Sequence, residues 1–199
     1  MNDEQMRLLS TPFDLVTGLS SKVDPIRRQL SAMSGMYADA EAFADMVAAG
    51  DPLVYEFYDL GVPADAGEIA FGTSITYPGK VGNEYFMTKG HFHSILETAE
   101  VYYCLSGEGR MMMENPEGDW KSCEMTAGAA VYVPARYAHR SINTSNDQPL
   151  VTFFAFRGDA GHDYGTIEDK GFRNLVVERD GRPVVISNPK WGSDPEDTQ

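Results

Sequence analysis

Three histidines and one glutamate in the middle of the chain have the types and spacing of a metal site. His91 and His93 are two residues apart, so on an extended strand both imidazoles lie on the same face. Glu100 opens a strand-like run seven residues later, and a charged side chain on the inward face of such a run needs a partner or a metal. His139 follows a further strand-like run and can bring a third imidazole to the same place. Three imidazoles and one carboxylate form an open site for a divalent first-row metal.

The segments that must position these residues have the composition of β-strands. From about residue 51 onward, short runs rich in Val, Tyr, Phe and Thr are interrupted at close intervals by Gly, Pro, Asn and Asp. This pattern is typical of an all-β sandwich or barrel, and no repeat indicates a solenoid. Turns at 106–109 and 115–118 are predicted to join central strands into hairpins. The predicted strands cover residues 53–60, 69–77, 84–89, 101–106, 110–114, 120–124, 130–134, 140–143, 151–157 and 175–179.

The first 50 residues have a different character, with the one clear helical pattern in the chain. Asp39 begins a run whose apolar residues recur on one face, and Gly50 closes it. Pro25 is predicted to begin a second short helix that continues through Leu30. We therefore expect a single-domain chain with a short helical N-terminal region. Its predicted parts are an N-terminal extension packed on the barrel (residues 1–50), the barrel (residues 51–191) and a frayed acidic tail (residues 192–199).

Composition and charge exclude several partners. The 199 residues include 16 basic and 30 acidic side chains, for a formal net charge of −14, so we expect neither nucleic acid nor a membrane as a partner. No apolar run approaches the roughly 18 residues of a membrane span. An anionic substrate would need local positive potential from a metal, backbone N–H groups or selected cations. Cys104 and Cys123 form no CxxC motif and the N-terminus lacks the layout of a signal peptide, so we expect a cytoplasmic protein.

Around the four candidate ligands, the sequence resembles the two motifs of the cupin superfamily. The first reads His91-x-His93, Glu100, then six residues to Gly107, and the second reads Gly128, five residues, Pro134, then His139, three residues and Asn143. Both motifs are close to the pattern of the superfamily.

The chain departs from the cupin pattern in three respects. Arg136 and Tyr85 stand where the pattern usually has glycine, and six residues, rather than three or four, separate His93 from Glu100. Glu97 occupies the shorter spacing and is therefore a rival ligand. The interval that follows Glu100, and its place on a predicted strand, favour Glu100.

Further short sequence motifs resemble, more specifically, those of the cupin-type, metal-dependent glucose-6-phosphate isomerases. They lie at residues 77–80, 88–93, 99–102, 116–118, 131–134, 137–140 and 160–165, within a stretch from about residue 50 to residue 191. The resemblance implies a cupin (jelly-roll) β-barrel that interconverts glucose 6-phosphate and fructose 6-phosphate, a step of glycolysis and gluconeogenesis. It also implies a homodimer with one divalent metal ion (iron, zinc, manganese or nickel) per subunit and a sugar phosphate as substrate.

The same resemblance implies roles for individual residues. His91, His93, Glu100 and His139 are implied as the metal ligands, with Glu100 and Tyr102 as catalytic residues. The implied substrate-binding residues are Tyr55, Ser74, Thr88, Gly90, His162 and Tyr164. In this scheme the sugar exchanges hydrogen between C1 and C2 through a metal-stabilised enediolate, with Glu100 as the base. A hydride shift is the open alternative.

Three other functions stay open at this point. A cupin dioxygenase would need iron, copper or nickel, molecular oxygen and a mainly apolar pocket. The short motifs that resemble the isomerase family are instead rich in hydroxyl groups and tyrosine. A sugar-binding regulatory module would keep the ligands but would need no base. Isomerisation of mannose 6-phosphate would use the same enediolate and differ only at the C2 face.

Overall fold

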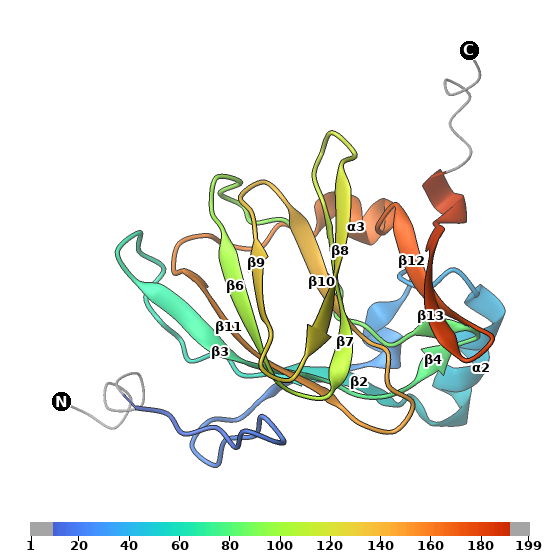
Figure 1. Ribbon diagram of the computed structural model, residues 1–199, viewed down its shortest axis with the longest axis horizontal. Helices are drawn as coiled ribbons and strands as arrows, with labels where there is room; N and C mark the ends of the chain where they lie inside the picture. Colours follow the sequence, from blue (N-terminus) through green and yellow to red (C-terminus); the bar gives the residue numbers. More distant parts are fainter. Residues whose placement is uncertain (1–9, 192–199) are drawn as a thin grey trace.

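The computed structural model describes residues 10–191, in which antiparallel strands form three curved sheets (Figure 1). The six-stranded sheet contains, in spatial order, β1 (Ile26–Gln29), β2 (Leu53–Phe57), β3 (Ile69–Thr76), β11 (Leu150–Arg157), β6 (Glu100–Ser106) and β9 (Ala130–Val133). The three-stranded sheet contains β10 (Ala138–Asn143), β7 (Glu108–Glu114) and β8 (Trp120–Thr126). The four-stranded sheet contains β13 (Arg182–Ser187), β12 (Asn174–Arg179), β5 (Glu84–Tyr85) and β4 (Lys80–Val81). The predicted all-β cupin (jelly-roll) fold is confirmed.

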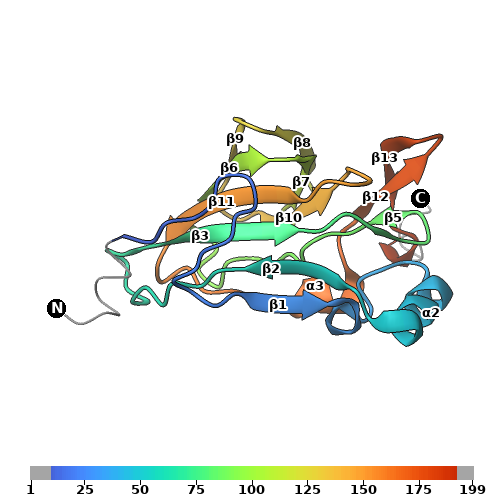
Figure 2. The same ribbon diagram turned by 90° about the horizontal axis from the view of Figure 1, so that it is seen from below.

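Side chains that alternate along the strands build the interior. In β6, Glu100 and Cys104 are buried, whereas Val101 and Tyr103 between them are exposed. The methionines of β7, at residues 111–113, are all buried and fill the core, as expected from the sequence. Figure 2 shows β3 and β11 as long neighbouring strands, with β2 and then β1 beyond β3 at the edge of the sheet. The inner face of this sheet therefore presents one side of each strand to an enclosed space.

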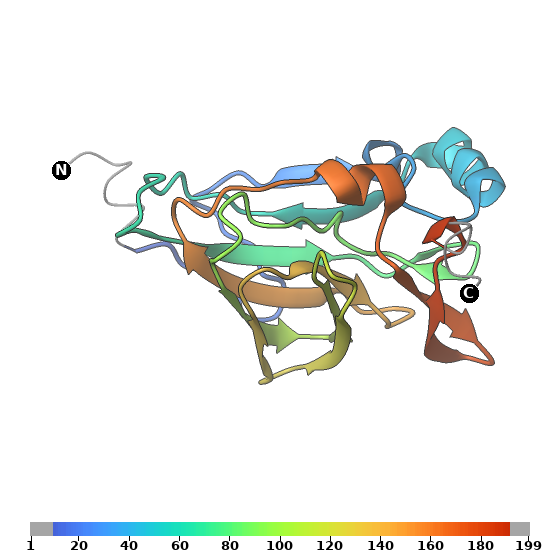
Figure 3. The ribbon, with the colours of Figure 1, turned by 90° about the horizontal axis from the view of Figure 1, so that it is seen from above.

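The N-terminal region contains a helix, but also a strand that the sequence did not predict. Helix α2 (Ala40–Gly50) begins where expected, because the Asp39 side chain accepts a hydrogen bond of 2.9 Å from the Ala42 N–H. The predicted helix from Pro25 is wrong: residues 26–29 form β1, which pairs with β2, and only then does the chain turn into the 3₁₀ helix η1 (Leu30–Met33). Pairing with a distant strand outweighs the local helical signal. In Figures 1 and 3, α2 lies at the same end of the molecule as β12 and β13.

One predicted hairpin is present and the other is not. Residues 115–118 turn between β7 and β8, which pair with each other. Residues 106–109 instead carry the chain from one sheet to another, since β6 pairs with β9 and β11 while β7 pairs with β8 and β10. Gly107 permits this crossing because its φ is +80° and an added Cβ would lie 2.2 Å from the Pro149 carbonyl oxygen. The sequence therefore located a turn correctly, but the prediction that the strands on either side of it pair with each other is wrong.

The predicted strand over residues 84–89 is much shorter in the structure. Only Glu84 and Tyr85 belong to a strand, and the following segment is held by isolated bridges between Met87 and Ile142 and between His91 and His139. The helix α3 (Gly165–Lys170), strand β13 and the short helix η2 (Pro189–Trp191) had not been predicted. The acidic tail at 192–199 lies outside the described residues. No helix within residues 10–191 is long and apolar enough to cross a membrane.

Candidate metal centre

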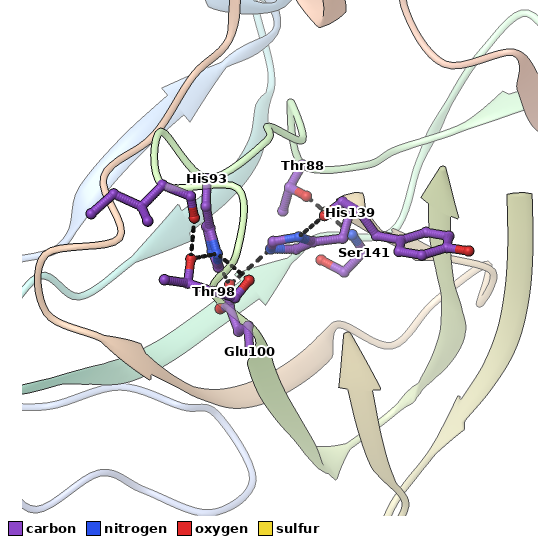
Figure 4. Close-up of polar contacts among 8 residues, drawn as sticks. Thr88, His93, Thr98, Glu100, His139 and Ser141 are labelled. Atoms are coloured by element: carbon purple, nitrogen blue, oxygen red, sulfur yellow. Dashed lines mark hydrogen bonds and ion pairs between the residues drawn. The ribbon is translucent and has the colours of Figure 1, made fainter. Parts of the chain in front are cut away.

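Four side chains from three parts of the chain converge at one point inside the barrel. His91, His93, Glu100 and His139 each offer one ligand atom, and these atoms all lie within 4.8 Å of one another. Glu100 opens β6, His139 lies near the start of β10, and the two other histidines belong to the irregular segment that precedes β6. Figure 4 shows the side chains of His93, Glu100 and His139 pointing toward one another. The structure therefore brings together all four predicted ligands.

Local backbone geometry explains how the irregular segment reaches β10. The backbone N–H of His91 donates to the carbonyl of His139 over 3.4 Å, and the N–H of His139 donates back to His91 over 3.1 Å. Gly90 makes this approach possible because its φ is +76° and an added Cβ would lie 2.9 Å from the His139 carbonyl oxygen. A side chain at residue 90 would push the first two histidines away from the third.

Hydrogen bonds at the outer nitrogens orient two of the imidazoles. The Thr98 hydroxyl donates to the carbonyl of Ile95 over 2.7 Å, so its oxygen is left to accept from His93 Nδ1, which lies 2.7 Å away. His139 Nδ1 lies 3.4 Å from the carbonyl oxygen of Tyr137, which can only accept. In each case the ring proton belongs on Nδ1, and Nε2 carries a free lone pair.

The lone pairs then face a carboxylate oxygen, and this arrangement needs a cation. Glu100 Oε2 lies 3.1 Å from His93 Nε2 and 2.9 Å from His139 Nε2. His91 Nε2 is buried and has no hydrogen-bond partner among the described residues. Three imidazole nitrogens and one carboxylate oxygen, buried together and held by second partners at their outer atoms, are the donor set of a divalent metal. The residues present therefore fit such an ion.

The electrostatics of the four groups agree with this arrangement. Burial would raise the pKa of Glu100, but His139 and His93 oppose this, so the pKa lies below its ordinary value and the carboxylate is ionised. Burial, together with the neighbouring imidazoles of His139 and His162, holds the pKa of His91 well below its usual range. An ionised carboxylate buried beside three imidazoles leaves the site ready to accept positive charge.

The rival ligand Glu97 lies elsewhere. Its side chain is 72% exposed and its Oε1 is 3.1 Å from Arg136 Nη1. Arg136 has a φ of +72°, which is consistent with a glycine being usual at this position, and its guanidinium also contacts Glu117 over 2.8 Å. The arginine thus holds Glu97 on the surface, outside the cluster of ligand atoms.

A single pocket opens onto the cluster and contains the other predicted site residues. Tyr102 follows Glu100 on the inner face of β6, and burial with the nearby Glu100 carboxylate raises its pKa well above the usual value. His93 is almost fully buried and lies behind the pocket wall. The predicted residues that line the pocket are Tyr55, Ser74, Thr88, Gly90, His91, Glu100, Tyr102, His139, His162 and Tyr164.

The pocket wall combines polar and apolar groups. Thr88 is paired with Ser141 by a backbone hydrogen bond of 2.9 Å, and the Thr88 hydroxyl accepts from the Ser141 N–H over 3.1 Å. Phe154 and Phe156 of β11 form an apolar wall beside Tyr102 and His93. The sequence analysis missed Ser141 and both phenylalanines. The alternation of Phe154 and Phe156 on a predicted strand was the available signal, but only the register of β11 against β6 shows that they face the site.

His162 and Tyr164 lie on the loop that precedes α3. The His162 ring is 4.3 Å from the His91 ring, in an edge-on arrangement, and lies 6.1 Å from the Tyr164 ring in a stacked one. His162 is exposed as a residue, although its ring contacts the site. These two side chains therefore lie on the open side of the pocket.

The family model and the similar sequences agree on one family. The family model described as glucose-6-phosphate isomerase matches residues 27–191. The glucose-6-phosphate isomerase of Thermococcus litoralis is 49% identical over 178 residues, which cover 89% of this chain and 93% of that protein. The enzyme of the same name from Pyrococcus furiosus is 44% identical, with coverage of 89% and 94%. Among solved structures, an oxalate decarboxylase from Bacillus subtilis is 28% identical over 53% of this chain and 26% of its own, with a TM-score of 0.42.

Proposed function

The chain belongs to the cupin-type glucose-6-phosphate isomerase family, and we propose that it interconverts glucose 6-phosphate and fructose 6-phosphate with one divalent metal ion per subunit. The main support is the convergence of three imidazoles and a carboxylate on a pocket lined by hydroxyl groups. A cupin dioxygenase is not favoured, because the matching family model and the similar relatives are glucose-6-phosphate isomerases.

The metal would be held by His91, His93, Glu100 and His139. When bound, it supplies Lewis-acid stabilisation for the negative charge that develops on substrate oxygens during the exchange. Iron, zinc, manganese and nickel all accept imidazole nitrogen together with carboxylate oxygen, so the donor set does not select one of them.

We assign the proton transfer between C1 and C2 to the carboxylate of Glu100. Its Oε2 faces the imidazoles, which leaves the other oxygen available to take a proton from one carbon and return it to the next. Tyr102 shares the inner face of β6 with Glu100 and is assigned a role in orienting the sugar or the glutamate. In the alternative hydride shift, Glu100 would serve only as a ligand, and no solvent deuterium would enter the product.

The remaining predicted residues are assigned to the sugar phosphate. Ser74 and Thr88 offer hydroxyl groups, and Gly90 offers a backbone N–H, for the phosphate. Tyr55, His162 and Tyr164 are assigned to the rest of the substrate. These groups lie on the pocket wall next to the ligands, so the phosphate would hold the reacting carbons at a fixed distance from Glu100.

The decisive experiment is a coupled assay of the purified protein before and after treatment with EDTA, combined with metal analysis. We expect chelation to abolish conversion of fructose 6-phosphate and a divalent first-row metal to restore it. Mannose 6-phosphate, assayed in parallel, tests the other epimer at C2. Full activity of protein shown to be free of metal would refute the metal-dependent proposal.

We further propose that the protein is a homodimer in the cytoplasm. The outer face of the six-stranded sheet carries the exposed apolar side chains of Ile69, Val101, Tyr103 and Tyr132 on β3, β6 and β9. Within the described residues, the N-terminal segment covers another part of this face, where Thr73 donates to the carbonyl of Gly18 and Ser106 to the carbonyl of Val16. A second copy of the chain would cover the exposed apolar side chains. Light scattering should give twice the subunit mass, and Tyr132→Glu should give the monomer.

A further inference from the structure

The pocket has little positive charge of its own to attract a phosphate. The chain carries a formal net charge of −14, and a sugar phosphate is a dianion near neutral pH. Within the described residues, Lys89 is the one lysine or arginine that lines the pocket, and its Nζ lies 2.8 Å from the Glu168 carboxylate. An acidic partner at this distance offsets much of the lysine charge. A second cation near the pocket would therefore matter for binding.

Arg28 on β1 is such a cation. In the register between β1 and β2, Arg28 lies opposite Tyr55, and its Cζ lies 5.8 Å from the centre of the Phe57 ring. Tyr55 and Phe57 both line the pocket, and Phe57 lies opposite Ser74 in the register between β2 and β3. The guanidinium is thus placed beside the wall to which the phosphate is assigned.

The neighbouring arginine shows what a structural cation on this strand looks like. Arg27 points to the other face of β1, where its Nε lies 3.0 Å from Glu56 Oε2. Arg28 has no carboxylate within ion-pair distance among residues 10–191. It donates a long bond of 3.3 Å to the carbonyl of Arg27 and also hydrogen-bonds to the Tyr55 hydroxyl. Its side chain is half-buried against Phe57. In a chain with almost twice as many acids as bases, a cation left without a carboxylate at a pocket wall is free to meet an anionic ligand.

The charge of Arg28 also reaches two hydroxyl groups of the pocket. Burial raises the pKa of Tyr55 to about 12, and the positive charge of Arg28 works against that rise. Burial likewise raises the pKa of Tyr164, and Arg28 again opposes it. The positive charge of the guanidinium therefore influences the hydroxyl groups of both Tyr55 and Tyr164, which line the pocket.

We propose that Arg28 is a specificity-determining residue that attracts and holds the phosphate group of the sugar phosphate. A guanidinium can donate two parallel hydrogen bonds to a phosphate, which the hydroxyls of Ser74 and Thr88 supplement without charge. Among residues 10–191, Arg28 forms no ion pair that binding of the phosphate would break. The inference rests on the proposed function for its substrate, and it gives the N-terminal strand a role in the site.

The test compares Arg28→Gln with the matched control Arg27→Gln. For Arg28→Gln we expect the KM for fructose 6-phosphate to rise by about tenfold or more, with kcat changed by less than about threefold. The inhibition constant of inorganic phosphate should rise in parallel, since this probe carries the phosphate without the sugar. Arg27→Gln should leave both constants unchanged, because its side chain is on the opposite face of β1. Arg28→Lys keeps the positive charge but loses the two parallel N–H donors of the guanidinium. Its KM and its phosphate inhibition constant should lie between those of the wild type and Arg28→Gln.

The outcomes separate this inference from the proposed function. An unchanged KM and an unchanged phosphate inhibition constant in Arg28→Gln would overturn the role of Arg28 while leaving the isomerase intact. A rise in KM without a rise in the phosphate constant would also overturn it, because Arg28 would then act on the sugar. If the wild-type protein has no isomerase activity, the proposed function fails, and calorimetric binding of inorganic phosphate to wild type, Arg28→Gln and Arg28→Lys still decides whether Arg28 holds a phosphate.

Discussion

Two buried polar clusters lie on opposite faces of β10, and they solve the problem of buried charge in opposite ways. His139 faces the pocket and joins a cluster of lone pairs and one anion. Arg140, the next residue, faces away and is 2% exposed. Its guanidinium lies 4.1 Å from the centre of the Phe172 ring, contacts the sulfur of Met87 over 3.0 Å and donates to the carbonyl of Lys89.

The difference lies in which group supplies the positive charge. Around Arg140, the carboxylates of Glu84 and Glu114 are also buried, and the protein provides the cation itself. Around His139, the described residues provide three imidazoles and the Glu100 carboxylate but no lysine or arginine, so we expect the cation to come from outside. A cluster that contains its own counter-charge destabilises the fold when one partner is removed, whereas one that lacks a cation can take up an ion from outside. Changes to either cluster should therefore affect different properties.

The largest effect is expected from Glu100→Gln. The amide keeps the size of the side chain and an oxygen for a metal but removes the basic site, so kcat should fall by roughly 10²-fold or more. The matched variant Glu97→Gln should keep nearly full activity, because Glu97 is exposed and paired with Arg136. Steady-state kinetics together with metal analysis of both variants would measure this.

The same pair of variants can show that the wrong glutamate was chosen. An inactive Glu97→Gln beside a fully active Glu100→Gln would reverse the assignment of the carboxylate. If both variants retain activity, neither of these two carboxylates acts as the base. Retention of all substrate hydrogen in deuterium oxide would favour the hydride shift instead.

Arg140→Met should affect stability rather than the chemistry. The substitution removes a charge that opposes the burial of Glu84 and, together with Arg173, that of Glu114. Loss of one partner from a buried charged cluster costs about 3–5 kcal/mol. Urea unfolding would measure the loss, and the folded fraction of the variant should still bind metal, because Arg140 is not among the ligands.

Arg136→Met provides the control for this substitution. Arg136 also contacts two carboxylates, but its side chain is 42% exposed and the pairs lie in water. Its loss should leave the free energy of unfolding almost unchanged, because exposed ion pairs contribute little to stability. Equal losses in the two variants would mean that burial does not distinguish the Arg140 cluster from a surface network.

The ligand cluster could be predicted from the sequence because its signal is local and rare. Histidine is scarce in this chain, and the spacing of His91, His93 and Glu100 is that of a recognisable motif. The helix after Asp39 was predictable for a similar reason, since a cap and one apolar face are local features. Such features need no knowledge of which strands pair.

What could not be predicted depends on pairing between distant strands. β1 exists because β2 offers it an edge, so residues 26–29 were mistaken for helix and Arg28 was not associated with the pocket. Ser141 reaches the pocket through its bonds with Thr88, more than 50 residues away in sequence. The hairpin predicted at Gly107 failed because a turn signal does not say which sheet the next strand joins. Register, not composition, carries this information.

The smallest expected effect concerns pH and the carboxyl group of Glu84. Burial raises the pKa of Glu84 in the folded protein, although the N–H of Ala38 and the charges of Arg140 and Lys190 oppose the rise. Because this pKa is higher in the folded than in the unfolded chain, the protonated carboxyl contributes stability that is fully present below the unfolded pKa. That contribution is lost as the pH rises through the folded pKa. The Glu84→Gln variant has no such titration. The Tm of the variant minus that of the wild type should therefore increase as the pH is raised from about 5 to about 8.

The control for this titration is a glutamate that the solvent reaches freely. Glu124 has a side chain that is 76% exposed and forms only a surface contact of 3.3 Å with Arg110, so Glu124→Gln should follow the wild-type Tm in parallel across the same pH range. Parallel curves for Glu84→Gln as well would show that Glu84 is already ionised in the folded protein without penalty. The Arg140 cluster would then be a satisfied ion-pair network, and the contrast with the metal centre across β10 would rest on the ligand atoms alone.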